Sequence, residues 1–219
     1  MRHGPLQYFE CVALAFVAAC SSAPPPKPQV PADQTAKMEA QLRASFEAFN
    51  NRKRYPALTP KIIQAIPDVE IEQAILDLVD CRVQRSGKSK REVLSALPPG
   101  FRAVDATWWI EAEVSNGGFN QYFWNSAGEF AQDAVEGFDL IGAPALARLT
   151  ERAIAIRAND EARMAKLKQQ GSWEAFSESY EGNALNQLDA EFFEANPDLS
   201  QTRLRFIRGN PELFRARCD

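Results

Sequence analysis

The side chains that could take part in chemistry here are mainly carboxylates. The single histidine of the sequence, His3, lies in a segment that we expect to be removed. A mature chain without histidine excludes Ser-His-Asp and Cys-His nucleophiles, histidine general bases and nearly all histidine-ligated metal sites. The sequence also contains no phosphate-binding or dinucleotide-binding glycine motif. We therefore expect no cofactor, no metal site and no catalytic residues.

A carboxylate-only hydrolase of the glycosidase kind needs no histidine, so it stays open as an alternative. Its two acids would have to converge on a substrate. Glu111 and Glu113 lie two positions apart and would face different sides of a helix. Glu191 and Glu194 flank two phenylalanines, which favours a solvated rim around a core. The sequence thus favours a protein that binds over one that catalyses.

Acidic residues gather in two blocks. Residues 103–147 and residues 169–202 each contain seven acidic residues and no basic one, although the whole chain has a net charge of only −4. In the first block Glu129, Asp133 and Glu136 recur at helical spacing opposite apolar positions, and Asp139 follows. These four residues, here called the acidic ridge, predict either a solvated helix face or a protein-binding surface.

The most unusual string in the chain is the segment 113–128, which reads EVSNGGFNQYFWNSAG. Asn116 and Gly117 suit a helix end with a left-handed residue, and Gly118 permits a close approach of backbones. The aromatic residues supply core area, and the polar residues can bond the free backbone groups of two helix ends. The segment predicts a tight helical corner with a polar latch. The alternative is a pocket that binds through Gln121, Tyr122 and Asn125.

This segment resembles the signature of the bacterial DNA-mimic protein family, E-V-x-N-G-G-F-x-Q-Y-F-x-N-x-x-G. The hallmark positions are met by Glu113, Asn116, Gly117, Gly118, Phe119, Gln121, Tyr122, Phe123, Asn125 and Gly128. The resemblance covers about residues 95–170 and implies a helical domain. The family's namesake presents carboxylates in a duplex-like pattern to occupy a DNA-binding partner, which implies protein recognition without chemistry and without direct contact to nucleic acid.

The elements that must position these residues are helices. Apolar residues recur at helical spacing after about Thr35, and no stretch alternates as a half-buried strand does. Helices are expected over about 35–50, 71–86, 92–97, 104–116, 130–141, 146–171, 185–193 and 204–207. We predict an all-α fold, with a single compact multi-helix domain over residues 34–219.

Residues 1–19 are typical of a secretory signal peptide, because a basic start precedes the apolar run from Cys11 to Ala19. That run is far shorter than the ~20 residues of a membrane-spanning helix. It ends in Val-Ala-Ala-Cys20, which resembles the bacterial lipobox and implies lipidation of Cys20 after cleavage. Ser21 and Ser22 follow it, which resembles outer-membrane sorting. The alternatives are a plain signal peptide and a cytosolic protein.

Five prolines between residues 24 and 31 favour an extended polyproline II tether over residues 20–33. Two cysteines, Cys81 and Cys218, remain after the lipidation site. In an oxidising envelope they allow one disulfide, and the alternative is two unpaired thiols.

These features predict an envelope lipoprotein that is lipid-anchored, faces the periplasm and lies at the outer membrane. We expect its helical domain to bind an unknown protein partner through the acidic ridge. Two alternatives remain. One is a cytosolic DNA mimic that occupies a DNA-binding protein, and the other is the carboxylate-dependent envelope hydrolase.

Overall fold

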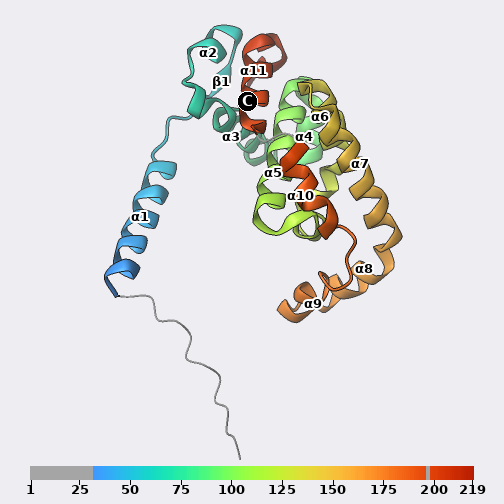
Figure 1. The fold of residues 1–219 in the computed structure, drawn as a ribbon. Helices are drawn as coiled ribbons and strands as arrows, with labels where there is room; N and C mark the ends of the chain where they lie inside the picture. Colours follow the sequence, from blue (N-terminus) through green and yellow to red (C-terminus); the bar gives the residue numbers. More distant parts are fainter. Residues whose placement is uncertain (1–31, 196–197) are drawn as a thin grey trace, which may run out of the picture. The chain divides into compact units, whose positions relative to one another are not determined.

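The computed structural model describes residues 32–195 and 198–219 (Figure 1). The predicted signal peptide and the predicted lipidation site, Cys20, lie outside these residues, as do residues 20–31 of the predicted tether. The chain divides into two units, residues 1–52 and 53–219, which are described separately.

Helix α1 (Ala32–Asn50) is the described part of the first unit. It begins before the predicted tether ends and stops where the sequence predicted. Its apolar face is exposed, with exposed fractions of 49–60% for Met38, Leu42, Phe46 and Phe49. The second unit, which contains the other helices, begins at Lys53.

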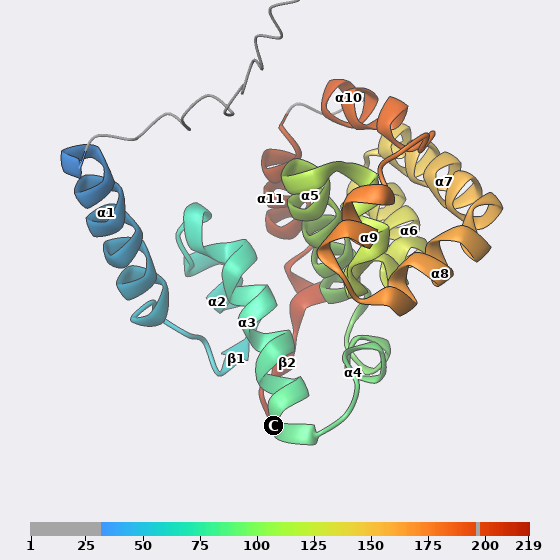
Figure 2. The same ribbon diagram turned by 90° about the horizontal axis from the view of Figure 1, so that it is seen from below.

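The second unit is built around helix α5 (Pro99–Trp124), as Figures 1 and 2 show. Helix α6 (Ala131–Ile141) packs against α5, and α7 (Pro144–Asn159) packs against α6. Helix α10 (Asn186–Ala195) contacts both α5 and α7. Phe119 and Phe138 are fully buried, and the ring of each faces Phe192 of α10. The predicted all-α fold is confirmed.

Five further elements pack on α5 or on one another. They are α2 (Pro60–Ala65), α3 (Asp68–Ser86), α4 (Lys90–Ala96), α11 (Leu199–Gly209) and the short 3-10 helix η2 (Pro211–Phe214). Helices α3 and α4 and η2 contact α5 directly, and α11 contacts α2 and α3. The sequence did not predict α2, which starts at Pro60 after Thr59 accepts a hydrogen bond from the Ile62 backbone.

A short antiparallel pair and a disulfide join the two ends of this unit. Strand β1 (Ala57–Leu58) pairs with β2 (Ala216–Arg217), with Ala57 opposite Arg217. The next residue, Cys218, donates its backbone N–H to the Pro56 carbonyl at 2.9 Å. Cys218 is bonded to Cys81 of α3, with a Cα–Cα distance of 5.6 Å.

One helix boundary was wrong in the sequence analysis. A single helix was expected from Leu146 to Gly171, but α7 ends at Asn159 and α8 (Glu161–Gln170) starts after Asp160. The Asp160 carboxylate accepts hydrogen bonds from Nε and Nη2 of Arg163 at 2.9 and 2.6 Å. Asp160 forms no side-chain cap to the backbone of α8, so its carboxylate acts at this break through Arg163.

Helices α8 and α9 (Trp173–Glu178) form a small second cluster beside the end of α5. Met164, Leu167 and Ala175 are buried there, with Trp124 packed against them. The 3-10 helix η1 (Ser126–Phe130) then links α5 to α6. None of the helices in the described ranges has a stretch both apolar and long enough to span a bilayer.

Candidate functional site

The predicted helical corner is a kink inside α5. Gly117 and Gly118 leave the helical conformation, and Gly118 adopts φ 72° and ψ −178°. The left-handed position is therefore Gly118, whereas the sequence analysis placed it at Asn116 or Gly117. A Cβ on Gly118 would lie 2.3 Å from an Asp189 carboxylate oxygen. Glycine is required here for two reasons, its positive φ and this close approach.

Asp189 of α10 caps the N-terminal end of the second half of α5. Its carboxylate accepts a hydrogen bond from the Phe119 backbone N–H at 2.9 Å. An acidic side chain at this position satisfies a free N–H and complements the positive end of the following helical turns. Burial raises the pKa of Asp189, and the hydrogen bond from Phe119 opposes that rise.

Glu113 latches the two halves of α5 together. Its Oε2 accepts hydrogen bonds from Gln121 Nε2 and from Asn125 Nδ2, both at 2.8 Å. Glu113 stands before the kink and the two amides stand after it, so the latch spans the glycines. The partner differs from the expected one, because both amides donate to a carboxylate side chain and not to free backbone groups of the helix ends.

Tyr122 is enclosed in the core. Its side chain is fully buried, and its hydroxyl has no hydrogen-bond partner among the described residues. Burial is the largest cause that raises its pKa, and the nearby carboxylates raise it further. The ring packs beside Phe123 in the core.

A second segment, residues 179–189, holds the kink from outside. Buried Asn120 donates to Ser179 Oγ at 2.7 Å and accepts from Asn183 Nδ2 at 2.6 Å. The Tyr180 hydroxyl donates to the Gly117 carbonyl at 2.9 Å. Sequence reasoning missed these partners, since they lie about 60 residues from the kink and form no recognisable motif.

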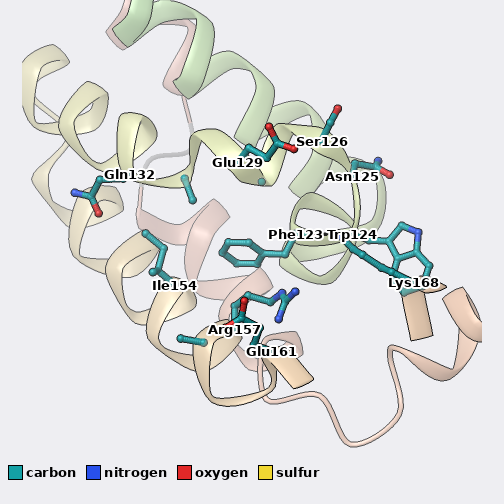
Figure 3. Close-up of a pocket in the computed structure, with 13 residues that line it drawn as sticks. Phe123, Trp124, Asn125, Ser126, Glu129, Gln132, Ile154, Arg157, Glu161 and Lys168 are labelled. Carbon is teal, nitrogen blue, oxygen red and sulfur yellow. Dashed lines mark hydrogen bonds between the residues drawn. The ribbon is translucent and has the colours of Figure 1, made fainter. Parts of the chain in front are cut away.

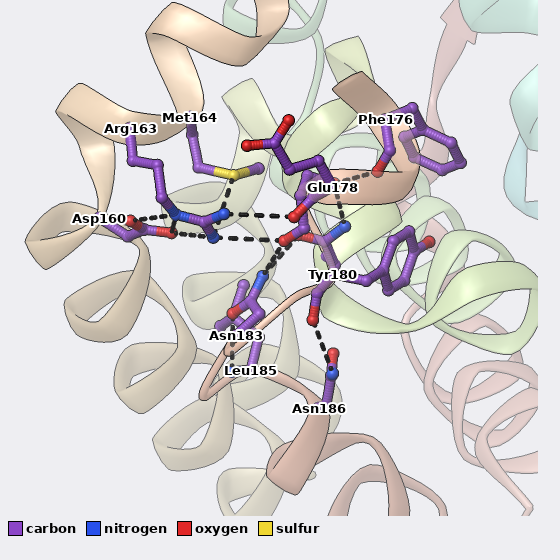
Figure 4. Close-up of polar contacts among 11 residues, drawn as sticks. Asp160, Arg163, Met164, Phe176, Glu178, Tyr180, Asn183, Leu185 and Asn186 are labelled. Atoms are coloured by element: carbon purple, nitrogen blue, oxygen red, sulfur yellow. Dashed lines mark hydrogen bonds and ion pairs between the residues drawn. The ribbon is translucent and has the colours of Figure 1, made fainter. Parts of the chain in front are cut away.

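Arg163 fixes this second segment to the start of α8, as Figure 4 shows. Besides its bonds to Asp160, its guanidinium donates to the carbonyls of Glu178 and Ser179, each at 3.3 Å. The pKa of Asp160 is lowered, chiefly by the hydrogen bond from Arg163. The break between α7 and α8 thus supports the signature kink through residues 178–183.

The acidic ridge is partly paired within the chain. Asp133 lies 3.2 Å from Arg91 Nη1 and 3.6 Å from Arg102 Nε, and Glu136 lies 3.2 Å from Arg102 Nη2. Glu129 and Asp139 are exposed, and neither forms an ion pair with a described residue. The two arginines belong to α4 and α5 but lie outside residues 103–147. The composition of that block alone therefore overstated how much negative charge is unpaired.

The acid pairs considered for catalysis diverge. Glu111 bonds the buried Arg203 at 2.5 Å, whereas Glu113 belongs to the latch. Glu191 pairs with Arg152 at 2.6 Å on the surface, and Glu194 is exposed. The two acids of each pair therefore have different partners or surroundings and do not converge on a common point.

Asp105 is a buried carboxyl away from the kink. It is 2% exposed and lies 2.9 Å from Lys90 Nζ. Burial raises the pKa of Asp105 to about 6, against the lowering effect of Lys90. Within the described residues, no group of three potential metal ligands is close enough to hold an ion.

Two hollows lie beside Trp124 at the end of the signature segment. The first, of about 610 Å³, is lined by the end of α5, η1, the start of α6, and parts of α7 and α8 (Figure 3). The second, of about 620 Å³, shares Trp124, Asn125 and Lys168 with the first and extends to Trp173 and Phe176. Glu129 and Glu161 both line the first hollow, together with the cations Arg157 and Lys168.

A family model matches more than half of the chain. Residues 95–210 match the family model described as DMP19-like protein. The match begins where the predicted resemblance began and runs 40 residues beyond its expected end at residue 170, so it includes the segment that holds the kink. No curated protein matches the chain.

Proposed function

The chain belongs to the DMP19-like protein family, whose model matches more than half of it, and from this membership we propose that the protein is a non-catalytic binding module. Its partner would be a protein with a basic surface, since the family is one of DNA-mimic-like domains. The observation that carries the proposal is the family match, which spans the acidic ridge.

The acidic ridge is the proposed binding surface. Glu129 and Asp139 offer exposed carboxylates, and Arg102 holds Glu136 and Asp133 in place. Four carboxylates against two arginines leave the surface negative. A fixed array of this kind favours a basic partner through electrostatic complementarity.

A binding role is also supported by how the perturbed acids are used. A catalytic acid needs a raised pKa and access to substrate. Asp105 and Asp189 are the described carboxyls with a raised pKa. Asp105 forms an ion pair with Lys90, and Asp189 accepts a hydrogen bond from the Phe119 backbone. Neither of them lines the two hollows beside Trp124.

We further propose that Cys20 anchors the protein to the outer membrane by lipid, with the domain facing the periplasm. The lipobox-like Val-Ala-Ala-Cys20 string and the proline-rich residues that follow support this localisation. The bond between Cys81 and Cys218 suits an oxidising compartment. In that compartment the partner would be an envelope protein.

The binding surface is tested by a double charge reversal, Glu129→Lys with Asp139→Lys. These two residues lack ion pairs among the described residues, so the fold should tolerate the change. We expect at least a tenfold loss of partner recovered by crosslinking and capture from envelope fractions. Recovery of the same partner should also fall as salt is raised from 50 to 300 mM, because salt screens exposed charges.

The matched control is Glu151→Lys with Glu194→Lys, which makes the same charge change at exposed positions of α7 and α10. It should keep wild-type recovery. Equal recovery with the ridge variant and with the control would rule out the acidic ridge as the binding surface.

The anchor is tested by metabolic labelling with a palmitate analogue. Cys20→Ala should lose the label, because the acylated sulfur is gone, and globomycin should cause precursor to accumulate. Cys81→Ala should keep the label. Unchanged incorporation in Cys20→Ala would disprove the anchor, whatever the outcome for the ridge.

A further inference from the structure

The first hollow beside Trp124 contains two cations that lack ion-pair partners. Arg157 of α7 and Lys168 of α8 both line it, and Figure 3 shows the Arg157 side chain directed into it. Neither forms an ion pair with a described carboxylate. In contrast, Arg152 and Arg163, on the same two helices, each pair with an acid.

Arg157 has an unsatisfied hydrogen-bond donor. Its Nη1 is buried and has no hydrogen-bond partner among the described residues. Buried polar atoms without partners are rare in native structures, since each costs free energy. An unsatisfied guanidinium nitrogen in a hollow suggests that an acceptor occupies that place in the working protein.

Lys168 lines the same hollow, and its surroundings disfavour its charged form. Its Nζ donates to the Phe123 carbonyl at 2.9 Å and lies 5.9 Å from the Trp124 ring centre. Burial lowers the pKa of Lys168 and the positive charge of Arg157 lowers it further, whereas the Glu129 carboxylate opposes this lowering. A bound anion would relieve both effects.

Part of the wall of the hollow is apolar and aromatic, and the rest is polar or charged. Phe123 and Trp124 come from α5, and Ile154 comes from α7. A volume of about 610 Å³ is in the range of sites for small organic ligands. The hollow thus combines a cationic pole with a surface that fits a planar ring.

We infer that this hollow is a binding site for a carboxylate that carries an aromatic or apolar group, with Arg157 as the main contact of the carboxylate. A single negative charge fits better than a phosphate dianion, because Glu129 and Glu161 also line the hollow and would repel a second charge. The inference does not rest on the proposed partner, although Glu129 belongs both to the acidic ridge and to the lining of the hollow.

The test measures binding of benzoate to the full chain by the NMR signal of the Trp124 indole N–H, assigned with Trp124→Phe. We expect saturable shifts with a dissociation constant on the order of millimolar, as is usual for so small a ligand. Benzamide, the neutral isostere, should bind at least tenfold more weakly. Phenyl phosphate should also bind more weakly than benzoate.

The variants assign the contact. Arg157→Gln should weaken benzoate binding at least tenfold, and Arg157→Lys should retain part of the affinity because it keeps the charge. Folding should survive, since Nη1 bonds nothing in the fold. Arg148→Gln removes the same charge from an exposed position of α7 and should leave affinity within twofold.

Three results would overturn the inference: equal binding of benzoate and benzamide, no effect of Arg157→Gln, or tighter binding of phenyl phosphate. The peptide acetyl-Ala-Ala-Phe, as free acid and as amide, distinguishes two sources of carboxylate. Free acid that binds tenfold tighter than benzoate would assign a polypeptide C-terminus. A smaller gain would assign a free aromatic acid.

Discussion

Gly118 and Asp105 show how single residues set the behaviour of the site and of the fold. Gly118 is the point where α5 turns, and the Asp189 carboxylate occupies the space of its missing side chain. Asp105 places an ionisable group in the core beside one lysine. Each has a measurable consequence for stability.

Gly118→Ala should lower the free energy of unfolding by about 3–4 kcal/mol, because it adds backbone strain and displaces Asp189 from the Phe119 N–H. Gly87→Ala is the control. Gly87 also has a positive φ, of 65°, but a Cβ there would meet nothing within 4 Å. The control should lose only about 1 kcal/mol. Urea unfolding measures the loss of stability in both variants. Equal losses would contradict the claim that the close approach of Asp189 to Gly118 adds to the cost.

The ionisation of Asp105 should be detectable in the pH dependence of the free energy of unfolding. Its folded-state pKa of about 6 lies above the ordinary value of 3.8, so the folded state holds the proton more tightly. The contribution of Asp105 to the free energy of unfolding therefore falls as the pH rises from about 4 to above 6, by up to about 3 kcal/mol at 1.36 kcal/mol per pKa unit.

Asp105→Asn should remove this dependence. The difference in free energy of unfolding between wild type and Asp105→Asn, measured in urea from pH 4 to pH 8, should therefore change over that window. Asp139→Asn, at an exposed position of α6, should run parallel to wild type. Parallel curves for Asp105→Asn as well would show that Asp105 ionises normally.

At the scale of elements, the signature segment is a joint between helices. Glu113 fastens the two halves of α5 from within, and Asn120 and Gly117 are fastened by residues 179–183. The same joint leaves Trp124 and Lys168 between the two hollows. The polar residues of the segment thus hold together the joint whose end forms part of the wall of both hollows.

The acidic ridge also depends on its neighbouring elements. Helix α4 supplies Arg91 and α5 supplies Arg102, and both reach Asp133. Reversing Asp133 would place two like charges against the new lysine and lower stability. For this reason the charge-reversal test leaves Asp133 and Glu136 unchanged.

At the scale of the whole molecule, the unit 53–219 is closed by its own ends. The β1–β2 pair brings Ala57 opposite Arg217, and the Cys81–Cys218 bond joins residues that are 137 positions apart. Closing so long a loop restricts the unfolded chain strongly, by up to about 5 kcal/mol in the chain-entropy account. The disulfide should therefore contribute much of the net stability.

Reduction should lower the free energy of unfolding by about 3–5 kcal/mol, measured by urea unfolding with and without dithiothreitol. The double variant Cys81→Ser with Cys218→Ser should match the reduced wild type and ignore the reductant. An oxidised wild type that unfolds at the same urea concentration as the double variant would disprove the contribution.

Local information in the chain was sufficient for most of the fold. Apolar spacing predicted α3, α6, α10 and the body of α5, and Gly87, Gly142 and Gly171 end helices where expected. These features depend on residues within a few positions of one another, so the sequence reveals them directly. The signature segment likewise identified the family and its structural latch.

Contacts between distant residues were decided only by packing. The pairing of Asp133 with Arg91 and Arg102, the Asp189 cap on Phe119, and the meeting of Arg157 with Trp124 each join parts of the chain 30 to 70 residues apart. No local pattern encodes such a meeting, because it arises when helix faces are buried together and their remaining polar groups must find partners.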